Sequence, residues 1–212
     1  MRRIDKGPGP RSLGEHRRAG GDYDGYAGKD ELRDALLKEQ GFLCCYCMQR
    51  ISAPAMKIEH WASQADNDDK RLSYDNLLGA CTGGEGKRWK HQTCDTHKGK
   101  SKLTLHPARV PPDCAKVVQY PSNGETMSDD EDIQRDLDET LNLNTETLVK
   151  NRREVLYGLT RDLLGKRKNG TWPEGLLEKE RLKWTSLDGA GMYLEYCQVA
   201  VYYLDKKLKK KA

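Results

Sequence analysis

The stretch that decides the fold is KIEHWASQADNDDKRLSYDNLLGAC, residues 57–81. Glu59 and His60 follow the short apolar run AMKI, and Asn76 precedes a second apolar run. AMKIEHW predicts a short strand, whereas SYDNLLGAC predicts the start of a helix or a turn. A strand would put Glu59 and His60 on opposite faces, but a bend or the start of a loop would let both side chains reach one site.

Cysteines lie at both ends of this region. Cys44 and Cys47 form a C-x-x-C pair, and Cys81 and Cys94 form a looser pair separated by the insertion TGGEGKRWKHQT. Four thiolates in two pairs suit a tetrahedral zinc ion with a structural role. The spacing therefore predicts a zinc knuckle. The adjacent Cys45 is expected to point away from the metal.

The fourth zinc ligand stays open at this point, because the second pair departs from C-x-x-C. His91 or His97 could replace Cys94. Two other interpretations compete for the first pair: a redox motif and chance burial of small thiols. A redox C-x-x-C sits in a thioredoxin-like βαβ pattern, which is not seen here. The remaining cysteines, Cys114 and Cys197, are read as lone thiols.

The composition limits the classes of protein to which this chain can belong. Of 212 residues, 36% are hydrophobic and 33% charged, with one phenylalanine. Such a lean chain favours extra stabilisation from a metal or a partner subunit. No apolar leader and no run of about 18 apolar residues is visible, so we expect a cytoplasmic protein with no membrane partner. Clustered cysteines in that compartment indicate metal more often than disulfides.

Charge is unevenly distributed, although the formal net charge is only +4. Residues 82–102 contain six lysines and arginines against two acidic residues, and the tail DKKLKKKA is also basic. Residues 129–139 are strongly acidic. A basic stretch beside a metal site favours a phosphate-bearing partner over a merely solvated surface.

The chain divides into four segments. Residues 1–28 are rich in glycine, arginine and proline, and the glycines and prolines are too frequent for a helix. This segment predicts an extended arm that either docks on a partner or is disordered. Residues 29–106 predict a small ββα region. Its opening KDELRDALLKEQGF reads as a helix with Leu32, Leu36 and Leu37 on one face and Gly41 as its cap, followed by the knuckle CCYCMQRIS entering a strand.

Residues 107–128 predict a connector with room for a hairpin, since KVVQY is followed by the turn signal PSNGE. Residues 129–212 predict a helical subdomain with two apolar stripes. The stripes comprise Leu148, Val155, Leu156, Leu159 and Leu163, and then Leu194, Cys197, Ala200, Val201, Leu204 and Leu208. The expected fold class is therefore α+β, with a mainly helical C-terminal subdomain.

The polar residues of the central region suffice for phosphodiester hydrolysis. Glu59 with one further ligand can hold Mg²⁺, which also takes substrate phosphate oxygens. A neutral His60 can remove a proton from water, and the Asn76 amide can fix a loop. Asp95 and His97 follow Cys94, so zinc would hold them in place. Basic side chains that could grip a nucleic-acid backbone are Lys87, Arg88, Lys90, Lys98 and Lys100.

The ordered set CCYC, IEHW, YDNLLGAC and CDTHKGK, within about residues 40–102, resembles the HNH endonuclease pattern. The resemblance implies a ββα-metal fold with a zinc staple and one catalytic Mg²⁺ or Mn²⁺. It implies that His60 is the general base, Glu59 a metal ligand and Asn76 the loop-orienting residue. Asp95 takes the third position, where the pattern often has His or Asn, with His97 as its rival. Glu59 stands where the pattern often has Asp.

The flanks MRRIDKGPGP and LNLNTETLVKNRREVL resemble the HNH subunit of Septu-type antiphage systems and its retron-associated relatives. That resemblance implies an ATPase partner on which the arm and the helices dock, and a nuclease restrained until infection. DNA is the favoured substrate, while RNA, including tRNA, stays open. The alternative hypotheses are a non-catalytic zinc module that binds nucleic acid and an adaptor subunit with a degenerate nuclease core.

Overall fold

A computed structural model of the protein describes residues 1–166 and 172–209. Its described part combines helices with one two-stranded sheet, so the α+β class is confirmed. Strands β1 (Met56–His60) and β2 (Leu77–Cys81) pair antiparallel, with His60 opposite Leu77. The helices are α1 (Arg11–Arg18), α2 (Lys29–Gln40), α3 (Cys94–Lys98), α4 (Cys114–Val117), α5 (Glu131–Arg135), α6 (Glu146–Lys166), α7 (Glu174–Thr185) and α8 (Cys197–Lys209).

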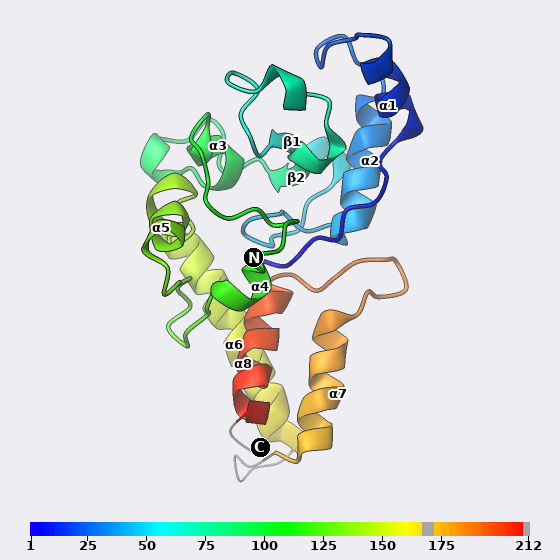
Figure 1. The fold of residues 1–212 in the computed structure, drawn as a ribbon. Coiled ribbons are helices and arrows are strands. Elements are labelled where there is room, and N and C mark those ends of the chain that lie inside the picture. Colours follow the sequence, from blue (N-terminus) through cyan, green and yellow to red (C-terminus); the bar gives the residue numbers. More distant parts are fainter. Residues whose placement is uncertain (167–171, 210–212) are drawn as a thin grey trace.

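The elements gather into two halves (Figure 1). The sheet half, residues 1–106, holds the sheet with α2 on one side and α3 on the other. The helical half, the described residues after 128, contains the long helices α6, α7 and α8. The N-terminus lies at the junction of the halves, and α8 runs from that junction toward the far end of the helical half.

Helix α2 forms as predicted. Leu32 and Leu36 are fully buried on one face, and the helix ends at Gly41, whose φ of 58° is left-handed and favours glycine. The last helical residue ties α2 to the sheet. The Gln40 side-chain amide donates to the carbonyl of Gly79 at 2.8 Å and accepts from its N–H at 2.7 Å.

Two local predictions in the sheet half are wrong. The knuckle does not enter a strand but closes as a tight loop with one bridge between Leu43 and Arg50. The stretch SYDNLLGAC contains strand β2, which follows a short 3₁₀ turn at Tyr74–Asn76. Every residue of β2 is buried, so its apolar run has no alternation that would distinguish a strand from a helix.

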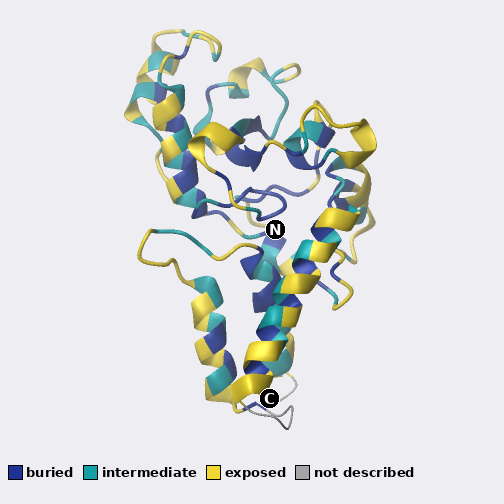
Figure 2. Ribbon diagram, turned by 180° about the vertical axis from the view of Figure 1, so that it is seen from behind, coloured by how far each residue is buried: buried dark blue, intermediate teal, exposed yellow. Residues whose placement is uncertain are grey.

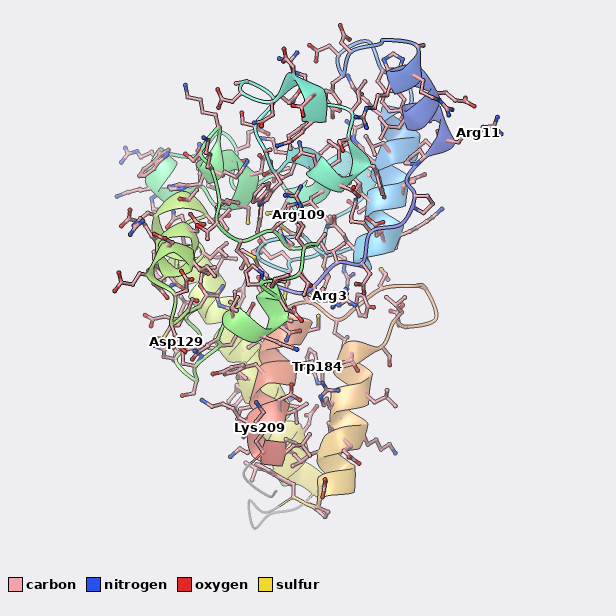
Figure 3. The ribbon with its side chains drawn as sticks, viewed as in Figure 1. Arg3, Arg11, Arg109, Asp129, Trp184 and Lys209 are labelled. Atoms are coloured by element: carbon pink, nitrogen blue, oxygen red, sulfur yellow. The ribbon has the colours of Figure 1, made fainter. Side chains whose placement is uncertain are left out.

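The N-terminal arm is packed against its own chain. Residues 1–10 are extended, but the expectation of no helix in this segment is wrong for α1, whose Leu13 is buried. Lys6 fixes the arm through a 2.7 Å ion pair with Glu39, and both side chains are nearly buried. Arg11, in contrast, points outward from α1 (Figure 3). The arm is thus packed on the sheet half in this structure, and docking on a partner stays a prediction.

The connector contains the expected hairpin contact, because Gln119 and Met127 exchange two backbone hydrogen bonds. In the helical half, buried and exposed faces alternate along α6 and α7 (Figure 2). Most members of both predicted stripes are buried, but Leu194 precedes the start of α8 and Val155 and Leu208 are half-buried. The predicted helical subdomain also includes residues 167–171 and 210–212, which lie outside the described residues. No described helix is both long and apolar enough to cross a membrane.

Candidate metal centre and active site

Four buried cysteines from three separate segments meet at one point. The sulfur atoms of Cys44 and Cys94 are 3.9 Å apart, those of Cys47 and Cys81 are 3.8 Å apart, and all four lie within 4.8 Å of one another. A tetrahedron with Zn–S bonds of about 2.3 Å has edges of about 3.8 Å. The cluster thus fits a tetrahedral metal ion such as zinc.

The insertion between Cys81 and Cys94 folds back on itself, which explains how a split pair can act as one. The N–H of Thr93 donates to the carbonyl of Gly83 at 2.8 Å. At Gly83 φ is 56°, and a Cβ would meet the Thr93 oxygen at 2.1 Å, so the close approach requires glycine. The loop therefore returns the chain beside its starting point and places Cys94 next to Cys81.

This geometry decides the fourth ligand. Cys94 belongs to the cluster, whereas His91 is exposed and outside it. His97 is also outside: its Nδ1 donates to the carbonyl of Thr140 at 3.0 Å, and its ring stacks on Trp89 with centroids 4.1 Å apart. The alternatives with a histidine ligand are therefore wrong.

The titration of the thiols indicates a site built for a cation. Burial alone raises the pKa of Cys44, but hydrogen bonds from the neighbouring thiols outweigh it and lower that pKa well below its usual range. The pKa values of Cys47 and Cys94 are raised, chiefly by their hydrogen bonds to Cys44. One negative charge is thus shared among buried thiols, and a metal ion would neutralise and deprotonate the set.

The other cysteines lie outside the cluster. Cys45 is not a member of the cluster, although its thiol interacts with that of Cys44; burial, and then this hydrogen bond, raise its pKa well above the usual range. Cys114 and Cys197 are buried free thiols whose pKa values burial also raises.

Glu59 and His60 are the last two residues of β1, so their side chains leave the strand in opposite directions, but Asp95 and Lys98 interact electrostatically with both of them. The Glu59 carboxylate accepts from the Tyr46 hydroxyl at 2.7 Å and pairs with the Lys98 ammonium at 2.8 Å. Its side chain is only 2% exposed and that of Lys98 is fully buried. Burial raises the pKa of Glu59 well above its usual range, and the adjacent Asp95 carboxyl adds to this effect, while Lys98 opposes it.

His60 is held in one tautomer. Its Nε2 lies 3.0 Å from the carbonyl oxygen of Arg71, and a carbonyl can only accept, so Nε2 carries the proton and Nδ1 keeps a lone pair. Within the described residues, Nδ1 has no hydrogen-bond partner, and the side chain as a whole is buried, at 6% exposure. Burial lowers the pKa of His60, which keeps the ring neutral at pH 7. The edge of Tyr23 packs against it at 4.5 Å.

Asn76 fixes the loop that presents the Arg71 carbonyl. Its Oδ1 accepts from the N–H of Ala62 at 2.8 Å, and its Nδ2 donates to the carbonyls of Ala62 at 3.0 Å and Lys70 at 3.2 Å. These are the cross-loop bonds expected from its position. Because they anchor both ends of the loop between the strands, Asn76 controls the orientation of His60 indirectly.

A catalytic divalent ion fits the residues only in part. The Asp95 carboxylate is 18% exposed, lies beside Glu59 and pairs with Lys57 at 3.6 Å. Two neighbouring carboxylates can hold Mg²⁺ with waters completing the shell. However, Lys98 already neutralises one of the two charges. Among described residues only the cysteines form a group of three or more ligands, so His97 does not join Glu59 and Asp95.

Four of the five basic residues predicted to bind a nucleic-acid backbone are at the surface, and the binding stays a prediction. Lys87, Arg88, Lys90 and Lys100 are exposed. The prediction is wrong for Lys98. Its buried ammonium binds Glu59 and the carbonyl of His60 at 3.1 Å, so it cannot reach a nucleic-acid backbone. Sequence reasoning also missed Tyr46 and Tyr23. A tyrosine inside the C-x-x-C motif was a signal for the first, but none pointed to the second.

No protein-family model matches this chain, and no curated protein is similar to it at a significant level.

Proposed function

We propose that this chain is a metal-dependent HNH-type endonuclease that hydrolyses nucleic-acid phosphodiester bonds. The observation that supports this most is the state of His60. Its Nε2 donates to the carbonyl of Arg71, its Nδ1 has no hydrogen-bond partner among the described residues, and its pKa is lowered. A neutral histidine with one free nitrogen is what a general base requires. The resemblance of the surrounding sequence to the HNH pattern supports the same function.

The residues around His60 would divide the work as follows. His60 takes a proton from a water molecule that attacks the phosphorus. Asn76 holds the loop and thereby the imidazole. Glu59 and Asp95 would hold Mg²⁺ or Mn²⁺, which supplies charge stabilisation at the phosphate when bound. Lys98 links the two faces of β1, because it binds the Glu59 carboxylate and the His60 carbonyl.

The biological setting is part of the proposal and rests on the resemblance of the flanks. We infer an effector subunit of an antiphage defence complex, acting with an ATPase in the cytoplasm. The packed arm and the exposed apolar side chains of the helical half, such as Leu182 and Leu187, are consistent with docking on a partner. DNA remains the favoured substrate, with RNA as the other choice.

One observation favours a second candidate, a non-catalytic zinc module that binds nucleic acid or serves as an adaptor in such a complex. Glu59 is nearly inaccessible and already bound by Tyr46 and Lys98. In that case the Lys98 ammonium would permanently occupy the position proposed for the metal ion, and the carboxylates of Glu59 and Asp95 would have a structural role.

The test is cleavage of plasmid DNA and total tRNA by the chain co-expressed with a neighbouring ATPase, in Mg²⁺ or Mn²⁺ against EDTA. The proposal expects metal-dependent cutting that Asp95→Asn weakens and His91→Ala leaves unchanged. Binding of nucleic acid by an intact complex, without cutting in either metal, would instead favour the non-catalytic module.

A further inference from the structure

A pocket of about 210 Å³ opens at the start of the loop that follows β1. Trp61, which follows His60 in the chain, forms one wall. Apolar, polar and charged side chains form the rest: Ala62, Ser63, Asp66, Asn67, Lys70, Lys100, Lys102 and Leu103. The pocket thus combines an aromatic surface with three cations and one carboxylate.

The pocket and the candidate base are parts of one rigid unit. Trp61 donates its backbone N–H to the carbonyl of Asn76 at 3.0 Å. Asn76 in turn binds the backbone of Ala62 and Lys70, both of which line the pocket. The carbonyl that orients His60 belongs to the next residue, Arg71. A ligand in the pocket would therefore be held at a fixed position relative to His60.

The side chains of the pocket are poised for an aromatic anion. The indole Nε1 of Trp61 donates to the carbonyl of Leu105 at 3.0 Å, which fixes the ring, and Arg109 lies 5.1 Å over it. Lys100 and Lys102 are exposed and form no ion pair with any residue in the described ranges. Fixed aromatic rings beside free cations are the elements that bind single-stranded nucleic acid.

We infer that this pocket binds one unpaired nucleotide next to the scissile phosphate, with its base against Trp61 and its phosphates on Lys100 and Lys102. The inference rests on the proposed nuclease function. The volume lies below the range of about 300–1,000 Å³ usual for small-molecule sites, which suits one base. Bases of a duplex are already stacked on each other and cannot use the indole, so the substrate class is single-stranded or locally unpaired DNA or RNA.

Binding is tested in the full chain with His60→Ala as background, so that cleavage does not consume the probe. Fluorescence anisotropy compares a labelled single-stranded oligonucleotide with a hairpin duplex of the same composition. The double variant Lys100→Ala, Lys102→Ala should lower the slope of log K against log salt by about 1.4 for the single strand. The matched control Lys179→Ala, Lys183→Ala, which removes two exposed charges from α7, should leave it unchanged.

Two further variants test whether a base stacks on Trp61. Trp61→Leu should weaken single-strand binding roughly 5- to 150-fold, while Trp61→Phe, which keeps an aromatic face, should retain most of it. Equal affinity for single strand and duplex would refute the proposed nucleotide site. Equal losses of affinity in the Lys100/Lys102 and Lys179/Lys183 double variants would also refute it. Cleavage by the wild-type chain is scored separately: a selective pocket without cleavage contradicts the nuclease, and cleavage without selectivity contradicts the pocket.

Discussion

The two halves of the molecule are stabilised by different means. In the sheet half, β1, β2 and α3 have five residues each, and the last residue of β2 and the first of α3 meet Cys44 and Cys47 of the knuckle in the four-cysteine cluster. In the helical half, α6, α7 and α8 have 21, 12 and 13 residues and pack through apolar stripes. Elements as short as those of the sheet half cannot hold their structure alone, so metal binding there should contribute directly to folding, together with the apolar core around α2. The helical half needs no such support.

Buried charge also differs between the halves. In the helical half, Arg152 is buried but donates to the carbonyls of Gly124 and Leu143, which is a structural role. In the sheet half, the buried Glu59 and Lys98 bind each other beside His60. Buried polar groups therefore converge on one point in the sheet half, where we place the function.

The largest expected effect is the loss of the metal. Cys47→Ser removes one of four thiolates and should leave the sheet half unfolded or molten, because the metal free energy is folding free energy there. The measurements are bound zinc by elemental analysis and thermal unfolding followed by circular dichroism. Cys114→Ser, a buried thiol outside the cluster, should keep its zinc. Stoichiometric zinc and an unchanged Tm in Cys47→Ser would refute the structural metal.

The second effect concerns the buried ion pair. Lys98→Met leaves the Glu59 carboxylate buried without its cation, which should lower the free energy of unfolding by about 3–5 kcal/mol. Chemical denaturation measures it, with Lys100→Met as an exposed control expected to change little. Adding Glu59→Gln to Lys98→Met should recover part of the loss. Equal stabilities of Lys98→Met and Lys100→Met would show that the pair is not formed.

The third effect isolates the helical half. Leu163 is fully buried between the helices, so Leu163→Ala should cost about 2–5 kcal/mol by transfer and cavity formation. Its neighbour Leu164 is 40% exposed, and Leu164→Ala should cost under about 0.5 kcal/mol. Bound zinc should be unchanged in both variants. Loss of zinc from Leu163→Ala would mean that the halves do not hold their structure independently.

The smallest effect is a pH dependence in the sheet half. Burial, and then Arg109, lower the pKa of His106 to about 4, whereas an unfolded histidine titrates near 6.5. The folded state binds fewer protons, so stability is full above about pH 6.5 and falls by about 1–3 kcal/mol as the pH is lowered toward 4. His106→Gln should flatten this slope and His91→Gln, at an exposed site, should not. An identical slope in both variants would contradict the assignment.

The predictable features were those that depend on local pattern. The face of α2, the stripes of α6 and α8 and the C-x-x-C knuckle follow from periodicity and spacing. The strand β2 was missed because a run buried on both faces has no period, and α1 because its glycine and the flanking prolines argue against a helix. The burial of Lys98 could not be predicted, because a lysine four residues after Cys94 is expected at the surface. Only the structure shows that its ammonium pairs with the buried Glu59.

The most direct test of the central claim is the single-turnover cleavage rate of the complex carrying His60→Ala, against His91→Ala as a matched exposed control. If His60 is the general base, its loss should slow cleavage by about 10²–10⁴-fold while leaving Tm and bound zinc unchanged. His91→Ala should cut at the wild-type rate. Equal rates in the two variants would contradict the role of His60 and with it the proposed active site.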